Sequence, residues 1–160
     1  MHIFEKSPEE LEAVNSDALV SPGGAVPWYI AGLAFECQEC GCCCKGPEEG
    51  YVWAKPEELA TLAEHLGLEE KAFYEKYVRR IGRRFSLIED KKTNDCIFVK
   101  GGKCQVYSVR PTQCRTWPFW HSNIETPEDW SYAAQRCEGV NRGPLHNARV
   151  IRQQADATRE

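Results

Sequence analysis

Five of the nine cysteines in this chain fall within eight residues, in the stretch FECQECGCCCKG, at positions 37, 40, 42, 43 and 44. Thiols this crowded constrain the fold, because they must be held by disulfides, by a metal or by burial in a core. The odd count excludes complete internal pairing, and consecutive cysteines are poorly placed for disulfides to distant segments. Whether the cellular compartment is oxidising or reducing then decides between disulfides and metal binding.

The N-terminal region predicts a protein that is neither exported nor anchored in a membrane. Its residues MHIFEKSPEELEAVNSDALV are acidic and lack the basic, apolar and small-residue order of a secretory signal. No apolar run approaches the roughly 20 residues that a membrane span needs. We therefore expect a cytoplasmic location, where thiols stay reduced and a high cysteine content favours metal binding over disulfides.

Composition and charge indicate one folded domain. The 160 residues are 42% hydrophobic and 28% charged, as in globular proteins long enough to bury a core. The formal net charge of -4 argues against nucleic acid as a partner. We predict a loosely ordered lead-in over 1–27, a cysteine-cluster domain over 28–143 and a tail or weak helix over 144–160. Within the lead-in, SPEELEAV predicts a brief helix over 7–14 with Ser7 as its N-cap.

Hydrophobic patterns and turn residues predict a small α+β fold with short strands, a β-hairpin and three to four helices. We expect strands over 50–54 and 85–89, helices over 55–68, 69–81 and 126–137, and a helical turn near Pro111. The last helix has Thr126 as its N-cap, Pro127 at its first position and Asp129 to complete a capping box.

The segment CIFVKGGKCQVY predicts the hairpin, with its turn at Gly101 and Gly102. Pairing of the two halves of this segment would place Cys96 and Cys104 on neighbouring strands of one small sheet. The hairpin therefore offers two further thiols close to each other.

The spacing of the crowded cysteines resembles that of known metal-binding loops. Cys37, Cys40 and Cys43 follow the pattern C-x2-C-x2-C, which zinc knuckles and bacterial ferredoxins use because a loop of this length curls around one ion. Gly41 allows a tight turn between ligands. Adjacent side chains are expected to point in different directions, so Cys44 is predicted to serve a second ion or to bridge two ions.

Four further cysteines, Cys96, Cys104, Cys114 and Cys137, are dispersed along the chain and can meet the loop only in the folded state. Four near ligands and four distant ones make eight, which is enough for two four-coordinate sites or one binuclear site. The predicted metal ligands are therefore Cys37, Cys40, Cys43, Cys44, Cys96, Cys104, Cys114 and Cys137. Cys42 occupies a spacer position and is left out.

The order FECQECGCCC, GYV, CIFV, CQVY and RPTQCRTWPFW, followed by a late cysteine and glycine, resembles the CxxCxxCC family, also described as YkgJ-like zinc- or iron-chelating domains. The resemblance covers about residues 28 to 140. It assigns the eight predicted ligands to the cysteines of the family, while Cys42 departs from the motif by adding a thiol. What it implies is zinc, iron or an iron–sulfur cluster as the cofactor; it implies no particular reaction.

All-thiolate coordination suits both zinc and iron–sulfur clusters, so the metal stays open. Thiolates leave excess negative charge at such a site, and Lys45, Arg110 and Arg115 flank the motif cysteines. These cations are expected either to offset that charge or to be ordinary surface residues.

Three classes of function remain. The leading hypothesis is a metal-binding protein with an auxiliary or redox role and an unidentified protein partner. The second is an enzyme: an iron–sulfur-dependent oxidoreductase or, by analogy alone, a relative of flagellin lysine methylases. The third is a metal chaperone, for which exchangeable thiols such as Cys42 would be needed.

Two other stretches could carry function. TWPFWHS places Trp117, Phe119 and Trp120 beside Cys114, either as a wall that excludes water or as ordinary core, and His121 could replace a thiol ligand. RRIGRR, residues 79–84, is expected to form a basic patch at a helix end, which more often complements the helix dipole than binds RNA.

Overall fold

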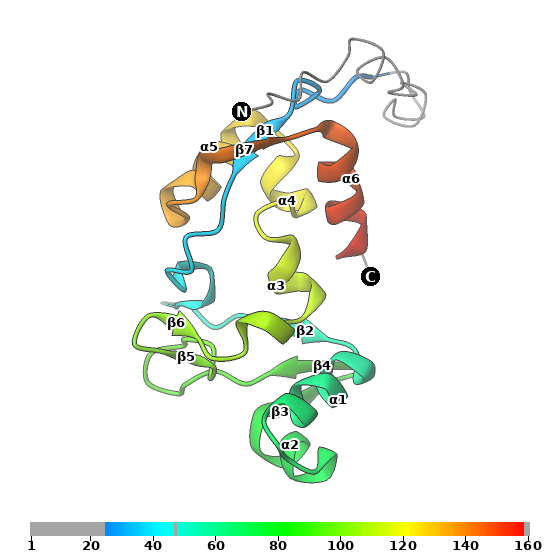
Figure 1. Ribbon diagram of the computed structural model, residues 1–160, viewed down its shortest axis with the longest axis vertical. Coiled ribbons are helices and arrows are strands. Elements are labelled where there is room, and N and C mark those ends of the chain that lie inside the picture. Colours follow the sequence, from blue (N-terminus) through cyan, green and yellow to red (C-terminus); the bar gives the residue numbers. More distant parts are fainter. Residues whose placement is uncertain (1–24, 47, 159–160) are drawn as a thin grey trace, which may run out of the picture.

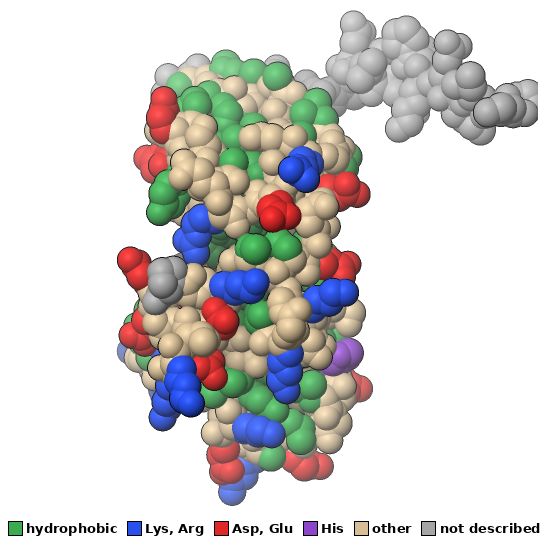
Figure 2. All heavy atoms as spheres, turned by 90° about the vertical axis from the view of Figure 1, so that its left-hand side faces the viewer, with side chains coloured by type: hydrophobic (Ala, Val, Ile, Leu, Met, Phe, Trp, Pro, Cys, Tyr) green, Lys and Arg blue, Asp and Glu red, His purple; other side chains and the backbone are tan. Residues whose placement is uncertain are grey.

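Residues 25–46 and 48–158 are described by a computed structural model with α+β architecture, as the sequence predicts (Figure 1). The helix expected over 7–14, and nearly all of the lead-in that contains it, lie outside the described residues. Among the described residues no helix is both long and apolar enough to cross a membrane. Figure 2 shows one long face on which Lys and Arg side chains are spread from the upper part to the lower end, with Asp and Glu side chains among them.

The strands form three small antiparallel sheets within the described residues. The largest has the order β2-β4-β3, from Val52–Ala54, Arg84–Leu87 and Val78–Ile81. A second sheet pairs β1 (Leu33–Phe35) with β7 (Val140–His146), and so joins two segments far apart in the sequence. The third is the expected hairpin of β5 (Val99–Lys100) and β6 (Lys103–Cys104).

The helices begin and end where local sequence signals favour it. Thr126 and Asp129 form the predicted capping box of α5, and Pro127 is its first residue. The helices are α1 (Pro56–His65), α2 (Glu70–Tyr77), α3 (Thr112–Thr116), α4 (His121–Ile124), α5 (Pro127–Arg136) and α6 (Ala148–Ala157). Two short 3-10 helices, η3 (Cys42–Cys44) and η4 (Tyr107–Val109), lie in the cysteine-bearing segments.

The prediction of one helix through Ile81 is wrong. Helix α2 ends at Tyr77, and Val78, the next residue, is extended, with φ −120° and ψ 136°. The β-branched Val78 favours the extended backbone, and the strand it opens pairs with β4 through a tight turn in which Gly82 has φ 61°. RRIGRR therefore forms a β-turn with its flanking strands and not a basic patch at the end of a helix.

Two hydrophobic cores divide the molecule along its long axis. The core in the upper half of Figure 1 lies among β1, β7, α4, α5 and α6, and includes Phe119, Trp130 and Ile151. The core in the lower half lies among α1, α2, the three-stranded sheet and the β5–β6 hairpin, and includes Leu59 and Phe73. Helix α3 lies between the two halves, and the loop that carries the crowded cysteines runs from the upper half to the lower.

Candidate metal centre

The cysteine loop is shaped by one glycine. Gly41 has φ 67°, in the left-handed region, and directly precedes η3. The backbone N–H of Cys44 donates to the carbonyl oxygen of Gly41 at 3.0 Å. A Cβ atom at Gly41 would lie 2.5 Å from the carbonyl oxygen of Gly102, so the loop packs closely against the turn of the β5–β6 hairpin. Only glycine fits this position without strain.

Six of the eight predicted ligands line one cavity of about 70 Å³. They come from four segments: the cysteine loop, the residues after β4, strand β6 and helix α3. The six are Cys37, Cys43, Cys44, Cys96, Cys104 and Cys114. The fold therefore brings thiols that are distant in sequence into one space.

Backbone hydrogen bonds hold the distant cysteines at the cavity. The N–H of Cys96 donates to the carbonyl oxygen of Cys44 at 2.7 Å, and the N–H of Cys114 donates to Pro111 at 2.9 Å in the first turn of α3. Cys104 pairs with Val99 across the hairpin, as expected. Cys96 is not on the paired strand; it precedes β5 and forms a single bridge with Glu89, which corrects the predicted pairing.

Cys43 and Cys44 converge on the cavity. Their Sγ atoms are 3.6 Å apart, whereas divergent side chains were expected from their adjacency. In a tetrahedral site with Zn–S bonds of about 2.3 Å, neighbouring sulfurs are about 3.8 Å apart. The tight 3-10 turn at η3 brings both side chains to the same side of the loop, and the expectation of divergence is wrong.

The other three cysteines of the described region lie elsewhere. Neither Cys40 nor Cys42 lines the cavity, and the Cys42 Sγ lies 3.9 Å from the carbonyl oxygen of Cys40. Cys137 follows α5 and is buried in the upper core with Phe119 and Trp130. Cys40 and Cys137 are thus separate from the six cavity cysteines in this structure.

The cavity thiols differ in their acidity. A hydrogen bond between the two neighbouring thiols lowers the pKa of Cys43 to about 7 and raises that of Cys44. Burial raises the pKa of Cys96 to about 11 and also raises the pKa values of Cys104 and Cys114. A metal that binds here must therefore displace protons from Cys44, Cys96, Cys104 and Cys114, whose pKa values are raised.

Arg110 is the cation whose charge most affects the pKa values of these thiols. Its guanidinium lies over the Tyr107 ring, 3.8 Å from the centroid, and Nη1 donates to the carbonyl oxygen of Tyr107 at 2.6 Å. Its positive charge opposes the burial effect on the pKa values of Cys104 and Cys114. Among the flanking cations predicted from sequence, Arg110 and Arg115 line the cavity, while Lys45 lies at the neighbouring cleft.

Tyr107 is a site residue that sequence reasoning missed. A hydrogen bond with Cys37 raises the pKa of Tyr107 to about 12. The two residues are brought together by the packing of the cysteine loop against η4, and no local pattern in CQVYSVR signals this contact.

The residues of TWPFWHS have separate roles. Trp117 lines the cavity, and its indole N–H is buried without a hydrogen-bond partner among the described residues. Phe119 is in the upper core, where it stacks on Trp130.

Trp120 donates from Nε1 to the carbonyl oxygen of Gln113 at 2.9 Å. His121 does not line the cavity; its Nε2 is 3.0 Å from the carboxylate of Asp156.

The donor set of the cavity fits a soft metal. Thiolates select zinc and iron–sulfur centres over hard, oxygen-preferring cations, and the cavity is lined by six cysteines, whose sulfurs become such ligands once deprotonated, and by Arg110. In the conformation described, no group of three or more His, Cys, Asp or Glu side chains among residues 25–46 and 48–158 is set to hold an ion. Binding therefore requires the sulfurs to close around the metal.

Comparisons with known proteins show a family and relatives of the chain. The sequence model of the CxxCxxCC family, described as a "Putative zinc- or iron-chelating domain", matches residues 36–138. The uncharacterized protein MJ0661 of Methanocaldococcus jannaschii is 31% identical over 93 residues, which are 57% of this chain and 48% of that protein. The chain thus spans about half the length of this relative. No solved structure matches the chain.

Proposed function

The chain belongs to the CxxCxxCC family of zinc- or iron-chelating domains, and from this premise we propose that it holds zinc or an iron–sulfur centre in the six-cysteine cavity. We place the protein in the cytoplasm, with an auxiliary or redox role. Cys37, Cys43, Cys44, Cys96, Cys104 and Cys114 are the inner ligand set of this proposal. Cys40 and Cys137 remain proposed ligands from the sequence and would have to move to reach the cavity.

The observation that carries the proposal is the convergence of thiols from four segments on one cavity. Six thiolates suit a pair of zinc ions that share two bridging sulfurs, or an iron–sulfur cluster held by four of them. Beside Arg110 and Arg115, the cavity wall is formed largely by apolar side chains: Phe35, Leu87, Phe98, Val106 and Trp117. Such a wall keeps water from the metal and strengthens the effect of nearby charges.

The metal is proposed to stabilise the fold as well. Structural zinc contributes on the order of 10–16 kcal/mol in small peptides, while the stability of a whole domain is about 5–15 kcal/mol. The ligands connect the cysteine loop, the β5–β6 hairpin and α3, which lie at the junction of the two cores. Removal of the metal should therefore loosen the contact between the two halves.

A redox enzyme is a second candidate, favoured by a cleft on one side of the cysteines. This cleft, of about 530 Å³, shares Cys43, Cys44, Cys96 and Cys114 with the cavity. Cavities of about 300–1,000 Å³ are typical of small-molecule sites. A substrate in the cleft would lie directly beside a cluster in the cavity.

Anaerobic purification followed by elemental analysis and visible spectroscopy tests the proposal. A brown protein with iron and acid-labile sulfide supports a cluster, and reversible bleaching by a reductant supports the redox role. A colourless protein with a whole number of zinc ions per chain supports the auxiliary role. A chain that retains neither metal after anaerobic purification, and takes up neither on reconstitution, would contradict both.

A further inference from the structure

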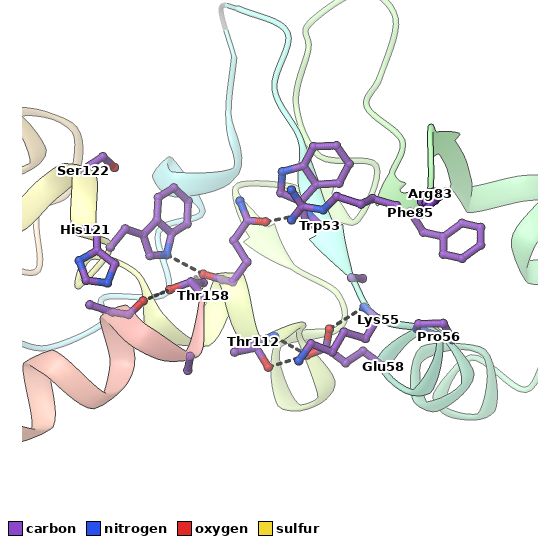
Figure 3. A pocket seen from close by; sticks show the side chains of 16 residues that line it. Trp53, Lys55, Pro56, Glu58, Arg83, Phe85, Thr112, His121, Ser122 and Thr158 are labelled. Atoms are coloured by element: carbon purple, nitrogen blue, oxygen red, sulfur yellow. Dashed lines mark hydrogen bonds between the residues drawn. The ribbon is translucent and has the colours of Figure 1, made fainter. Parts of the chain in front are cut away.

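A further cavity, of about 470 Å³, is lined by residues of the three-stranded sheet, α1, α3, α4 and the end of α6, and by none of the cysteines. Figure 3 shows Trp53 and Phe85, from the three-stranded sheet, on one side of it, and His121, Ser122 and Thr158, from α4 and the end of α6, on the other. Its volume is within the range of about 300–1,000 Å³ usual for small-molecule sites.

The charge at this cavity is positive although the chain as a whole is acidic. Three cations line it: Lys55, Arg83 and Arg84. One acidic residue, Glu58, is among the described residues that line the cavity. Its carboxylate already accepts hydrogen bonds from the N–H of Lys55 and from Thr112. His121, which also lines the cavity, is paired with Asp156. The cavity thus presents an excess of positive charge.

Two arginines on the three-stranded sheet differ in whether acidic residues neutralise their charge. Arg79 stacks over Tyr51 and is paired with Glu49 and Glu89, at 2.7 and 3.6 Å. Arg84 stacks over Trp53, 4.1 Å from the ring centroid, but forms no ion pair with a described residue. The sheet therefore neutralises one stacked arginine internally and leaves the other exposed at the cavity.

Arg84 is also the end of a stacked series. Tyr51 and Trp53 are stacked at 4.8 Å with an interplanar angle of 7°, and the guanidinium of Arg84 lies on Trp53. A guanidinium plane stacks well on a further flat ring, and Trp53 already limits its movement. Next to it, Arg83 lies in the β3–β4 turn and forms no hydrogen bond or ion pair with another described residue.

From these observations we propose that this cavity binds a small anion that carries a planar ring, with the ring stacked on the Arg84 guanidinium and the acidic group bound by Arg83 and Arg84. A nucleoside monophosphate and an aromatic carboxylate share this chemistry. The apolar surfaces of Phe85 and Trp120 complete the ring site. Thr112 and Gln113, which line this cavity, precede Cys114 on α3, so the ligand would bind one residue away from a proposed metal ligand.

Isothermal titration of the purified full-length chain tests the proposal with four compounds: AMP, adenosine, inorganic phosphate and 4-hydroxybenzoate. We expect at least one of the two ring-bearing anions to bind more tightly than adenosine and than phosphate. Tighter binding of AMP assigns the site to phosphate esters, and tighter binding of 4-hydroxybenzoate assigns it to carboxylates. Absence of binding by both anions, or binding of neither anion more tightly than adenosine and phosphate, would overturn the proposal.

The paired variant Arg83→Gln/Arg84→Gln locates the site. We expect it to bind the preferred anion at least about tenfold more weakly, since each charged hydrogen bond contributes on the order of 1.5–3 kcal/mol and 1.4 kcal/mol is tenfold. Arg149→Gln is the control, because Arg149 is exposed on α6 and lies outside the cavity. An equal loss in Arg149→Gln, or none in the paired variant, would overturn the assignment. Elemental analysis and thermal unfolding of the same samples separate this result from any change in metal content or folding.

Discussion

The backbone N–H of Cys96 donates a 2.7 Å hydrogen bond to the carbonyl oxygen of Cys44. A second bond beside it joins the N–H of Gly46 to the carboxylate of Asp95 at 2.9 Å. The cysteine loop is thus fastened to the segment after β4 by its backbone, independently of any sulfur ligation. Because these bonds set the relative position of two groups of thiols, part of the ordering needed for metal binding is already present in the fold.

Replacement of a cavity cysteine tests which thiols hold the metal. Cys114→Ser removes a sulfur from the cavity, and we expect the bound metal per chain to fall by about half or more, since a structural metal site depends on its full ligand set. The matched control is Cys42→Ser, which alters a thiol that does not line the cavity and should leave metal content unchanged. Elemental analysis measures both. Equal metal loss in the two variants would show that the inner ligand set is misassigned.

Gly41→Ala tests the packing of the cysteine loop on the hairpin. The added Cβ would meet the Gly102 carbonyl oxygen at 2.5 Å, in addition to the roughly 1–2 kcal/mol that a left-handed backbone costs a non-glycine residue. Gly67→Ala is the control, because Gly67 has a similar φ of 65° and a Cβ there meets nothing within 4 Å. We expect Gly41→Ala to reduce the urea midpoint and metal content clearly more than Gly67→Ala. Equal effects would mean that the loop does not rest on the hairpin as described.

Glu58 connects α1 to α3. Its carboxylate accepts from the Lys55 N–H at 2.9 Å and from the N–H and hydroxyl of Thr112 at 2.7 and 2.6 Å. Glu58→Gln should lower the free energy of unfolding at pH 7 by about 1–3 kcal/mol, because the amide disrupts this set of acceptors. Urea unfolding measures the loss, and Glu57→Gln, an exposed neighbour, should change little.

The same carboxylate predicts a pH dependence. Burial by itself would raise the pKa of Glu58, but the hydrogen bonds from Lys55 and Thr112 outweigh it and the pKa is lowered. The stabilisation is therefore complete above the unfolded value of about 4.3 and is lost as the pH falls through the lower folded value. The stability difference between the natural chain and Glu58→Gln should shrink below about pH 4. A difference that is constant from pH 7 to pH 3 would contradict this account.

The last helix is expected to be essential to the upper core. Ile151 is fully buried in α6, and Ile151→Ala should reduce the free energy of unfolding by about 2–5 kcal/mol through lost burial and a residual cavity. Leu145→Ala is the control, since Leu145 is 66% exposed and its replacement should stay within about 0.5 kcal/mol. Thermal and urea unfolding measure both. An unchanged free energy of unfolding in Ile151→Ala would show that α6 does not support the core.

Short sequence signals correctly predicted those helix starts and turns whose formation depends on residues close together in the chain. The capping box of Thr126 and Asp129, the first-turn Pro56 of α1 and the Gly101–Gly102 turn lie where expected, because each acts over a few residues. The end of α2 was missed, since the choice between helix and strand at Val78 depends on its pairing with β4. Strand β1 was missed for the same reason, as its partner β7 lies at the other end of the domain.

The sequence by itself determined that the chain is a cysteine-rich domain of a zinc- or iron-chelating family, because the cysteine spacing and the family motif are properties of the order of residues. Only the tertiary structure decided which thiols share a space: it separated Cys40 and Cys137 from the six cavity cysteines and made Cys43 and Cys44 converge. It also placed Arg84 on Trp53 beside a cavity that no motif marks. The physical reason is that side-chain proximity between distant segments depends on strand register and core packing, and these are settled by burial of the whole chain.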